Sequence, residues 1–229
     1  MTQNHSALRE PPRQAWSRGH ALGMLAAVAA CQRWHAAWPS AVLAGPSCLI
    51  FILVSRKVLT PSGRFGFANA VTGLRLALAL GLTLPVAALT SAASAAVTIG
   101  ILLLDLLDGW LARARGDASI FGAHFDMETD AILVLVVTLR LWLVEGYPAW
   151  ALIAGLLRYA YVLALWLFPG TGREAPRSLF ARYAFLILML SLLGALVVHG
   201  EYGTWCIGLG TLVVSFSFVR SFYFSHSAI

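Results

Sequence analysis

Long apolar runs constrain this sequence more than any other feature. They recur from residue 68 to the C-terminal region, each close to the roughly 20 residues that a helix needs to cross a hydrocarbon core. The runs are continuous and rich in leucine and alanine, whereas the strands of a membrane β-barrel alternate apolar with polar residues. Only 11% of the residues are charged, against about 25% in a soluble domain. The chain is therefore predicted to be an all-α, polytopic membrane helical bundle.

Six spans follow from these runs, with boundaries good to about four residues. They cover residues 68–89, 95–113, 122–143, 147–167, 179–198 and 202–222. Together they predict a six-helix domain over residues 67–229. One or two further hydrophobic helices are expected before it.

The first 66 residues differ in composition from the rest. Residues 1–20 are polar and are predicted to form an arm, and residues 21–66 are predicted to form a hydrophobic hairpin with its connector. Two short apolar pieces in the second segment favour the hairpin. One alternative is a single span, and another is an export signal that ends at Cys31 in the sequence VAAC.

Positive charge is distributed unevenly between the two ends of the spans. The net charge of +6 comes almost wholly from arginine, and basic residues gather before the first span, after the second, between the fourth and fifth, and at the end of the sixth. Cytoplasmic loops of membrane proteins are enriched in arginine and lysine, so the turn between the second and third spans is predicted to face the cytoplasm. The expected setting is the cytoplasmic membrane, with membrane lipids and not nucleic acid as partners.

All five aspartates of the chain lie between residues 105 and 130, in sequence that is otherwise typical of membrane helices. Asp105 and Asp108 share one stripe of the second span, and Asp126 and Asp130 share a stripe of the third. Neighbouring antiparallel helices can bring the two stripes face to face. Each ionised carboxylate at membrane depth costs about 2.5 to 3.5 kcal/mol, and four together also repel one another. A divalent cation is the simplest compensation.

The kind of ligand indicates the kind of metal. Carboxylate oxygens suit Mg²⁺ or Mn²⁺, whereas Zn²⁺ would need a set of histidines and cysteines that the sequence does not arrange. The alternative to a metal is ion pairing with Arg113 and Arg115, but these arginines are too few for four acids. Gly109 and Gly122 also favour a ligand site, because glycine lets a backbone approach another helix or a bulky ligand closely.

The spacing of these residues resembles a known family signature. The pattern D-x2-D-G-x2-A-R-x8-G-x3-D-x3-D is that of the CDP-alcohol phosphotransferase (CDP-alcohol phosphatidyltransferase) family, and the sequence matches it at Asp105, Asp108, Gly109, Ala112, Arg113, Gly122, Asp126 and Asp130. Upstream, ANAVTGLRL resembles the family's P-N-x-L-T-x-x-R and keeps Asn69, Thr72 and Arg75, whereas Ala68 and Val71 depart from it. The resemblance covers about residues 68–222.

This resemblance implies an enzyme of phospholipid biosynthesis that moves a phosphatidyl group from CDP-diacylglycerol to a small polar alcohol and releases CMP. It implies that the four signature aspartates hold Mg²⁺ or Mn²⁺ as a pair of ions, and that Asp130 also takes the proton of the acceptor. The residues carried over as nucleotide-binding are Asn69, Thr72, Arg75, Gly109, Ala112, Arg113 and Gly122. A homodimer is carried over as well. The acceptor alcohol stays open, as does the variant reaction in which diacylglycerol attacks a CDP-alcohol.

Three arginines outside the signature are candidates for binding the acceptor. Arg158 lies inside the fourth span, where an unpaired cation is costly, so it is predicted to face a polar cavity and hold a phosphate or carboxylate. A structural pairing with an acid is the alternative. Arg177 lies in the loop before the fifth span and Arg182 at the start of that span, where members of the family carry basic residues. The alternative for these two is charge that only sets topology.

Two other classes of membrane protein use acidic residues. A transporter would place acids near mid-membrane on several helices, usually in a repeated architecture, whereas here they gather on two helices. A prenyltransferase would show two separated Asp-rich motifs, and the sequence has one such region. Asp117, His124 and Glu128 are expected to be bystanders, Glu128 because it lies on a different helical face from Asp126.

Overall fold

The computed structural model describes residues 11–56, 58–61, 64–84, 89–115, 118–169 and 179–226, without the side chains of residues 11–13, 108, 110–113 and 115. Over these residues the secondary structure is helical, with no strand. The prediction of a helical membrane bundle is confirmed.

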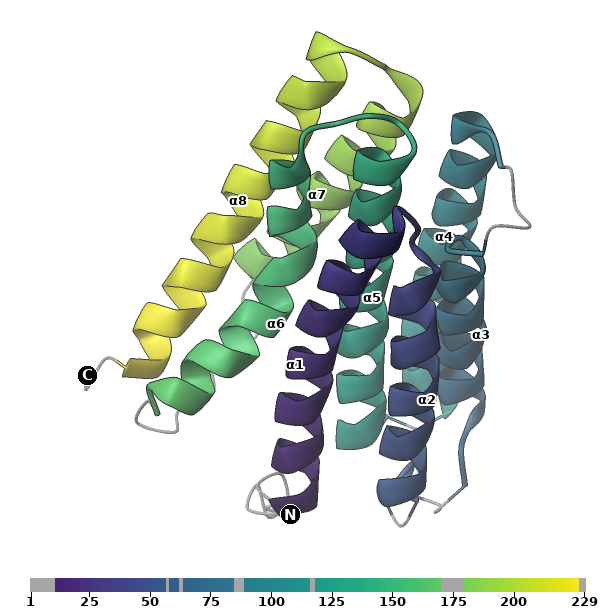
Figure 1. The fold of residues 1–229 in the computed structure, drawn as a ribbon. Coiled ribbons are helices and arrows are strands. Elements are labelled where there is room, and N and C mark those ends of the chain that lie inside the picture. Colours follow the sequence, from purple (N-terminus) through teal and green to yellow (C-terminus); the bar gives the residue numbers. More distant parts are fainter. Residues whose placement is uncertain are drawn as a thin grey trace.

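The helices, in chain order, are α1 (Pro11–Trp34), α2 (Trp38–Val54), α3 (Phe67–Gly81), α4 (Ser91–Arg115), α5 (Ile120–Leu143), the short 3₁₀ helix η2 (Ala149–Ala151), α6 (Leu152–Leu167), α7 (Leu179–Val197) and α8 (Glu201–His226). Figure 1 shows α3 and α4 on one side of α5, α7 and α8 on the other, and α1 and α2 in front of it. Helix α4 ends and α5 begins at the end of the bundle where α1 begins and α2 ends (Figure 1).

Three helices in the described part of the chain are long and apolar enough to cross a bilayer. They are η2 with α6 (Ala149–Leu167), α7 (Leu179–Val197) and α8 (Glu201–His226). Shorter apolar helices cover Trp38–Val54, Phe67–Gly81 and Ser91–Leu107. These lengths and compositions are those of an integral membrane protein.

The first two helices pack against each other as a hairpin. The chain turns between them at His35, which has a φ of 49°, and Pro39 stands in the first turn of α2, where its missing N–H is not needed. Residues 11–20, expected in a polar arm, instead form the start of α1. The division of the chain into 1–20, 21–66 and 67–229 otherwise stays a prediction.

The first core helix is shorter than its apolar run. α3 ends at Gly81, whereas the run predicts helix to residue 89. Pro85 follows in the sequence, and a proline disfavours the helical conformation of the residue before it, here Leu84. The other five predicted spans correspond to α4 to α8 with small differences at their ends.

Helix α5 lies at the centre of the bundle. Every residue from 131 to 141 is buried, and α5 packs against α3, α6 and α7 as well as the end of α2. A helix that is apolar all round is expected in such a position. Asp126 and Asp130 lie in the N-terminal half of α5 and are therefore carried by a helix that packing holds in place.

Candidate metal centre

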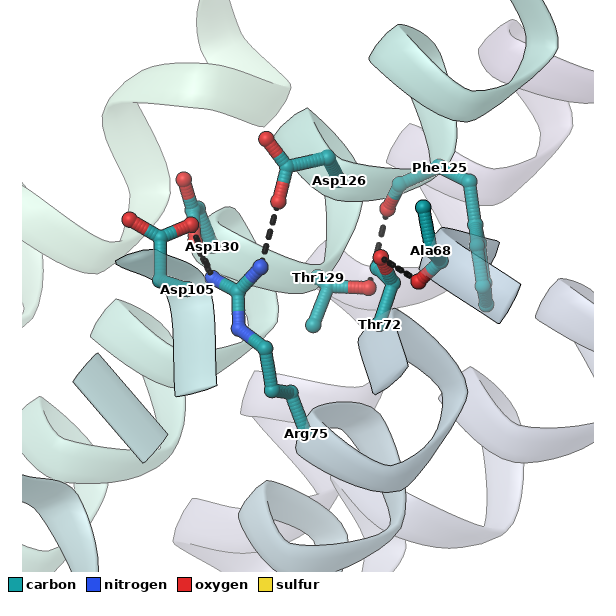
Figure 2. Close-up of polar contacts among 8 residues, drawn as sticks. All are labelled: Ala68, Thr72, Arg75, Asp105, Phe125, Asp126, Thr129 and Asp130. Carbon is teal, nitrogen blue, oxygen red and sulfur yellow. Dashed lines mark hydrogen bonds and ion pairs between the residues drawn. The ribbon is translucent and has the colours of Figure 1, made fainter. Parts of the chain in front are cut away.

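Three helices bring charged side chains to one place. Arg75 comes from α3, Asp105 from α4, and Asp126 and Asp130 from successive turns of α5 (Figure 2). One carboxylate oxygen of each aspartate lies within 4.8 Å of one from each of the others. The meeting of the two acidic stripes that the sequence predicted is therefore present for three of the four carboxylates.

The guanidinium of Arg75 lies among these acids. Its Nη1 is 2.5 Å from Oδ1 of Asp126, and its Nη2 is 2.6 Å from Oδ1 of Asp130 and 2.9 Å from Oδ1 of Asp105. The arginine side chain is fully buried, whereas the three carboxylates are 21% to 39% exposed. The cluster is thus closed on the side of α3 and remains accessible at its acidic groups.

Sequence reasoning missed Arg75 as a partner of the acids, because it weighed only Arg113 and Arg115. A signal was available. Arg75 stands in the apolar stretch LRLAL, and a cation inside a membrane helix requires a partner. The described acids that meet this requirement are those of the signature.

The remaining signature residues on α4 are placed by their backbone. Asp108, Ala112 and Arg113 lie in α4, after Asp105, and their side chains are outside what the structure describes. Their predicted roles, with that of Gly109, stay predictions.

A capped turn fixes the start of α5. The hydroxyl of Ser119 accepts a hydrogen bond from the backbone N–H of Gly122 at 2.9 Å, the usual arrangement at a helix N-cap. The same hydroxyl donates to the carbonyl of Leu59 at 2.6 Å, in the connector that follows α2. Ser119 was not singled out from the sequence, although a serine directly before an apolar helical run is a capping signal.

Asn69 joins the same junction from α3. Its amide Nδ2 donates to the carbonyls of Phe65 at 2.5 Å and Leu59 at 3.3 Å. A Cβ on Gly122 would lie 2.8 Å from Oδ1 of Asn69, so the glycine permits this close approach of α3 and α5. Thr72 donates to the carbonyl of Ala68, one turn earlier in α3 (Figure 2). Nucleotide contacts by Asn69, Thr72, Arg75 and Gly122 stay predictions.

The candidate acceptor residues do not join the cluster in the described part of the chain. Arg158 on α6 pairs with Glu128 on α5, with 2.5 Å between Nη2 and Oε1, and Glu128 is buried. Glu128 lies on the opposite face of α5 from Asp126, so the structural pairing held open for Arg158 is the arrangement seen. A cavity of about 160 Å³ between α1, α2, α5 and α6 lies beside this pair. Arg182 is exposed near the start of α7, and Arg177 lies outside the described residues.

The donor set suits a hard divalent cation. Three carboxylates near one another, partly exposed, offer the oxygen ligands that Mg²⁺ and Mn²⁺ prefer. One guanidinium compensates only one of three negative charges if all three acids are ionised. Further positive charge is therefore expected when the site works.

The fold and the site together define a class of protein. It is an integral membrane helical bundle with an acidic centre whose oxygen ligands suit a divalent ion. Within that class, the family model of the CDP-alcohol phosphatidyltransferases matches residues 65–217, and the chain belongs to this family. The match includes α3, α4 and α5 whole, with all four residues of the cluster, and leaves out α1 and α2. The resemblance seen in the signature is thus confirmed. No solved structure matches the chain.

Proposed function

We propose that this member of the family transfers a phosphatidyl group from CDP-diacylglycerol to a small polar alcohol and releases CMP. Membership in the family supports phosphatidyl transfer from a CDP-alcohol in the membrane. The observation that carries the proposal is the convergence of Asp105, Asp126 and Asp130, since a pyrophosphate donor brings negative charge that only bound cations would make tolerable beside these acids.

Asp105, Asp126 and Asp130 would hold the metal, together with Asp108 from the signature. When bound, Mg²⁺ or Mn²⁺ would screen the diphosphate and stabilise the charge that develops on the attacking and leaving oxygens. A pair of ions is proposed by analogy with two-metal sites. Gly109, Ala112, Arg113 and Gly122, with Asn69 and Thr72 from α3, are proposed to line the nucleotide.

The transfer itself exchanges one phosphorus–oxygen bond for another. The acceptor oxygen bonds to the phosphorus that carries diacylglycerol, and the bond from that phosphorus to the bridging oxygen breaks, so CMP leaves with the bridging oxygen. Asp130 is proposed to receive the acceptor's proton on its carboxylate. Its side chain is 21% exposed, so part of it is open to an acceptor.

The topology and assembly proposed for the protein follow from charge and from the family. The arginine-rich ends of the spans support an active site at the cytoplasmic side of the inner membrane. A homodimer is proposed on family grounds. Acceptor selection by Arg177 and Arg182 remains part of the proposal, whereas the ion pair of Arg158 with buried Glu128 favours the structural role that the sequence also allowed for Arg158.

Purified full-length protein in detergent, given Mn²⁺, labelled CDP-diacylglycerol and a panel of acceptors, tests the proposal by CMP release and identification of the lipid product. At least one hydroxylated acceptor is expected to support turnover. Asp130→Asn should lower it about 100-fold or more, the loss typical of a missing general base. Asp117→Asn is the matched control, because Asp117 lies outside the signature. Failure of every acceptor, or an Asp130→Asn protein as active as the control, would contradict the proposal.

A further inference from the structure

We propose that Arg75 is a built-in counter-charge of the metal centre: it keeps the three carboxylates together when no divalent ion is bound, and it competes with that ion for them. The inference rests on the proposed function in that it takes the aspartates to be metal ligands. It assigns Arg75 a role different from the nucleotide contact that the sequence suggested.

The geometry ties three helices through one side chain. Arg75 extends from α3, and its two terminal nitrogens contact one oxygen from α4 and two from α5. Guanidinium is planar, carries several donors in a fixed fork and stays charged at any ordinary pH, so it suits such multiple pairing. A lysine would offer one nitrogen with three donors in place of this rigid fork of two terminal nitrogens.

The burial of the Arg75 side chain requires its acidic partners. The Arg75 side chain is fully buried, and a buried cation is strongly unfavourable unless it is paired. The acids have the converse requirement, since carboxylates within 4.8 Å of one another repel when ionised. Each group therefore compensates the other, and the acids stay close together before any metal arrives.

The same contacts oppose metal binding to some extent. A divalent ion entering this cluster meets acids that already interact with a positive charge, and like charges repel. Without Arg75 the cluster would be more negative, so its affinity for the ion should rise while its stability without the ion should fall. A preassembled site of moderate affinity is the combination that Arg75 produces.

The test compares wild-type, Arg75→Gln, Arg75→Lys and Arg56→Gln proteins, full length and in one detergent. Unfolding midpoints are measured in chelator, and Mn²⁺ affinity is measured by electron paramagnetic resonance of the free ion. Arg75→Gln should lower the midpoint in chelator by about 5 °C or more. It should also tighten Mn²⁺ binding about threefold or more. Arg75→Lys should change the unfolding midpoint and the Mn²⁺ affinity in the same directions, but by smaller amounts. Arg56→Gln alters an exposed residue and should change neither quantity.

The outcomes separate this inference from the proposed function. An Arg75→Gln protein that folds only with Mn²⁺ supports it. If the Arg75→Gln protein folds neither in chelator nor with Mn²⁺, the Arg75→Lys protein decides. A wild-type unfolding midpoint and a wild-type Mn²⁺ affinity for that variant overturn the inference. Weaker or unchanged Mn²⁺ binding in a folded Arg75→Gln protein also overturns it. If wild-type protein binds no Mn²⁺ and releases no CMP, the proposed function itself has failed; if it does both, only the role of Arg75 is at stake.

Discussion

At the scale of single residues, Arg75 and Arg158 of the core helices answer the same electrostatic requirement with different acids. Arg75 pairs with three signature aspartates, and Arg158 pairs with Glu128 on the other side of α5. Arg75 and its three aspartates lie in the candidate metal centre. Arg158 and Glu128 lie beneath α1 and α2, next to a cavity and away from the aspartates.

The second pairing gives a prediction about Arg158. Arg158→Met leaves Glu128 as an uncompensated buried charge and should lower the free energy of unfolding by about 3 to 5 kcal/mol. Adding Glu128→Gln should recover most of this loss, because the buried charge is gone. The double variant should keep the wild-type KM for the acceptor, measured by CMP release. A stable double variant with a strongly raised acceptor KM would return Arg158 to the acceptor site.

The i and i+4 spacing of Asp126 and Asp130 made their shared face predictable from sequence, because helix geometry is local. The pairings across space were not predictable in this way. Nothing in the local pattern says that Arg75 meets Asp105 from another helix, or that Glu128 meets Arg158. Such partners depend on how helices rotate and pack, although the cost of an unpaired buried cation indicates that a partner exists.

At the scale of elements, apolar runs located the core helices, and local chemistry decided where they end. α3 stops before its apolar run does, ahead of a proline, and α5 starts at a serine cap. The connector after α2 contacts the starts of α3 and α5, through the hydrogen bonds that Asn69 and Ser119 donate to the carbonyl of Leu59. These contacts set α3 and α5, and thus Arg75 and the acids of α5, relative to each other.

Close packing of α5 against α6 gives a prediction at this scale. A Cβ on Gly155 would lie 2.5 Å from Oγ1 of Thr138 and 2.8 Å from the Cα of Leu135, a backbone atom that cannot turn away. Gly155→Ala should therefore push the helices apart and lower the free energy of unfolding by about 1 to 3 kcal/mol. Gly100→Ala on α4 is the matched control, since nothing lies within 4 Å of a Cβ there. Equal unfolding midpoints for the two variants would contradict this account of the α5 and α6 contact.

At the scale of the whole molecule, the chain combines a family core with two helices outside the matched region. α1 packs on α6, α2 reaches α5, and Phe51 of α2 stacks on Phe121 of α5 with 5.1 Å between ring centroids. Composition and apolar runs were sufficient to predict a membrane bundle with a preceding hairpin. They could not give the start of α1, because its first turns are polar and resemble an exposed arm.

The central claim is that Asp105, Asp126 and Asp130 together hold a divalent ion. Anomalous diffraction at the manganese edge, from crystals of the full chain grown with Mn²⁺, tests it most directly. The account predicts an anomalous peak between the carboxylates of these residues, and loss of that peak in Asp126→Asn. Full-length crystals with ordered aspartates that contact Arg75, and with manganese density absent from the cluster, would contradict the claim.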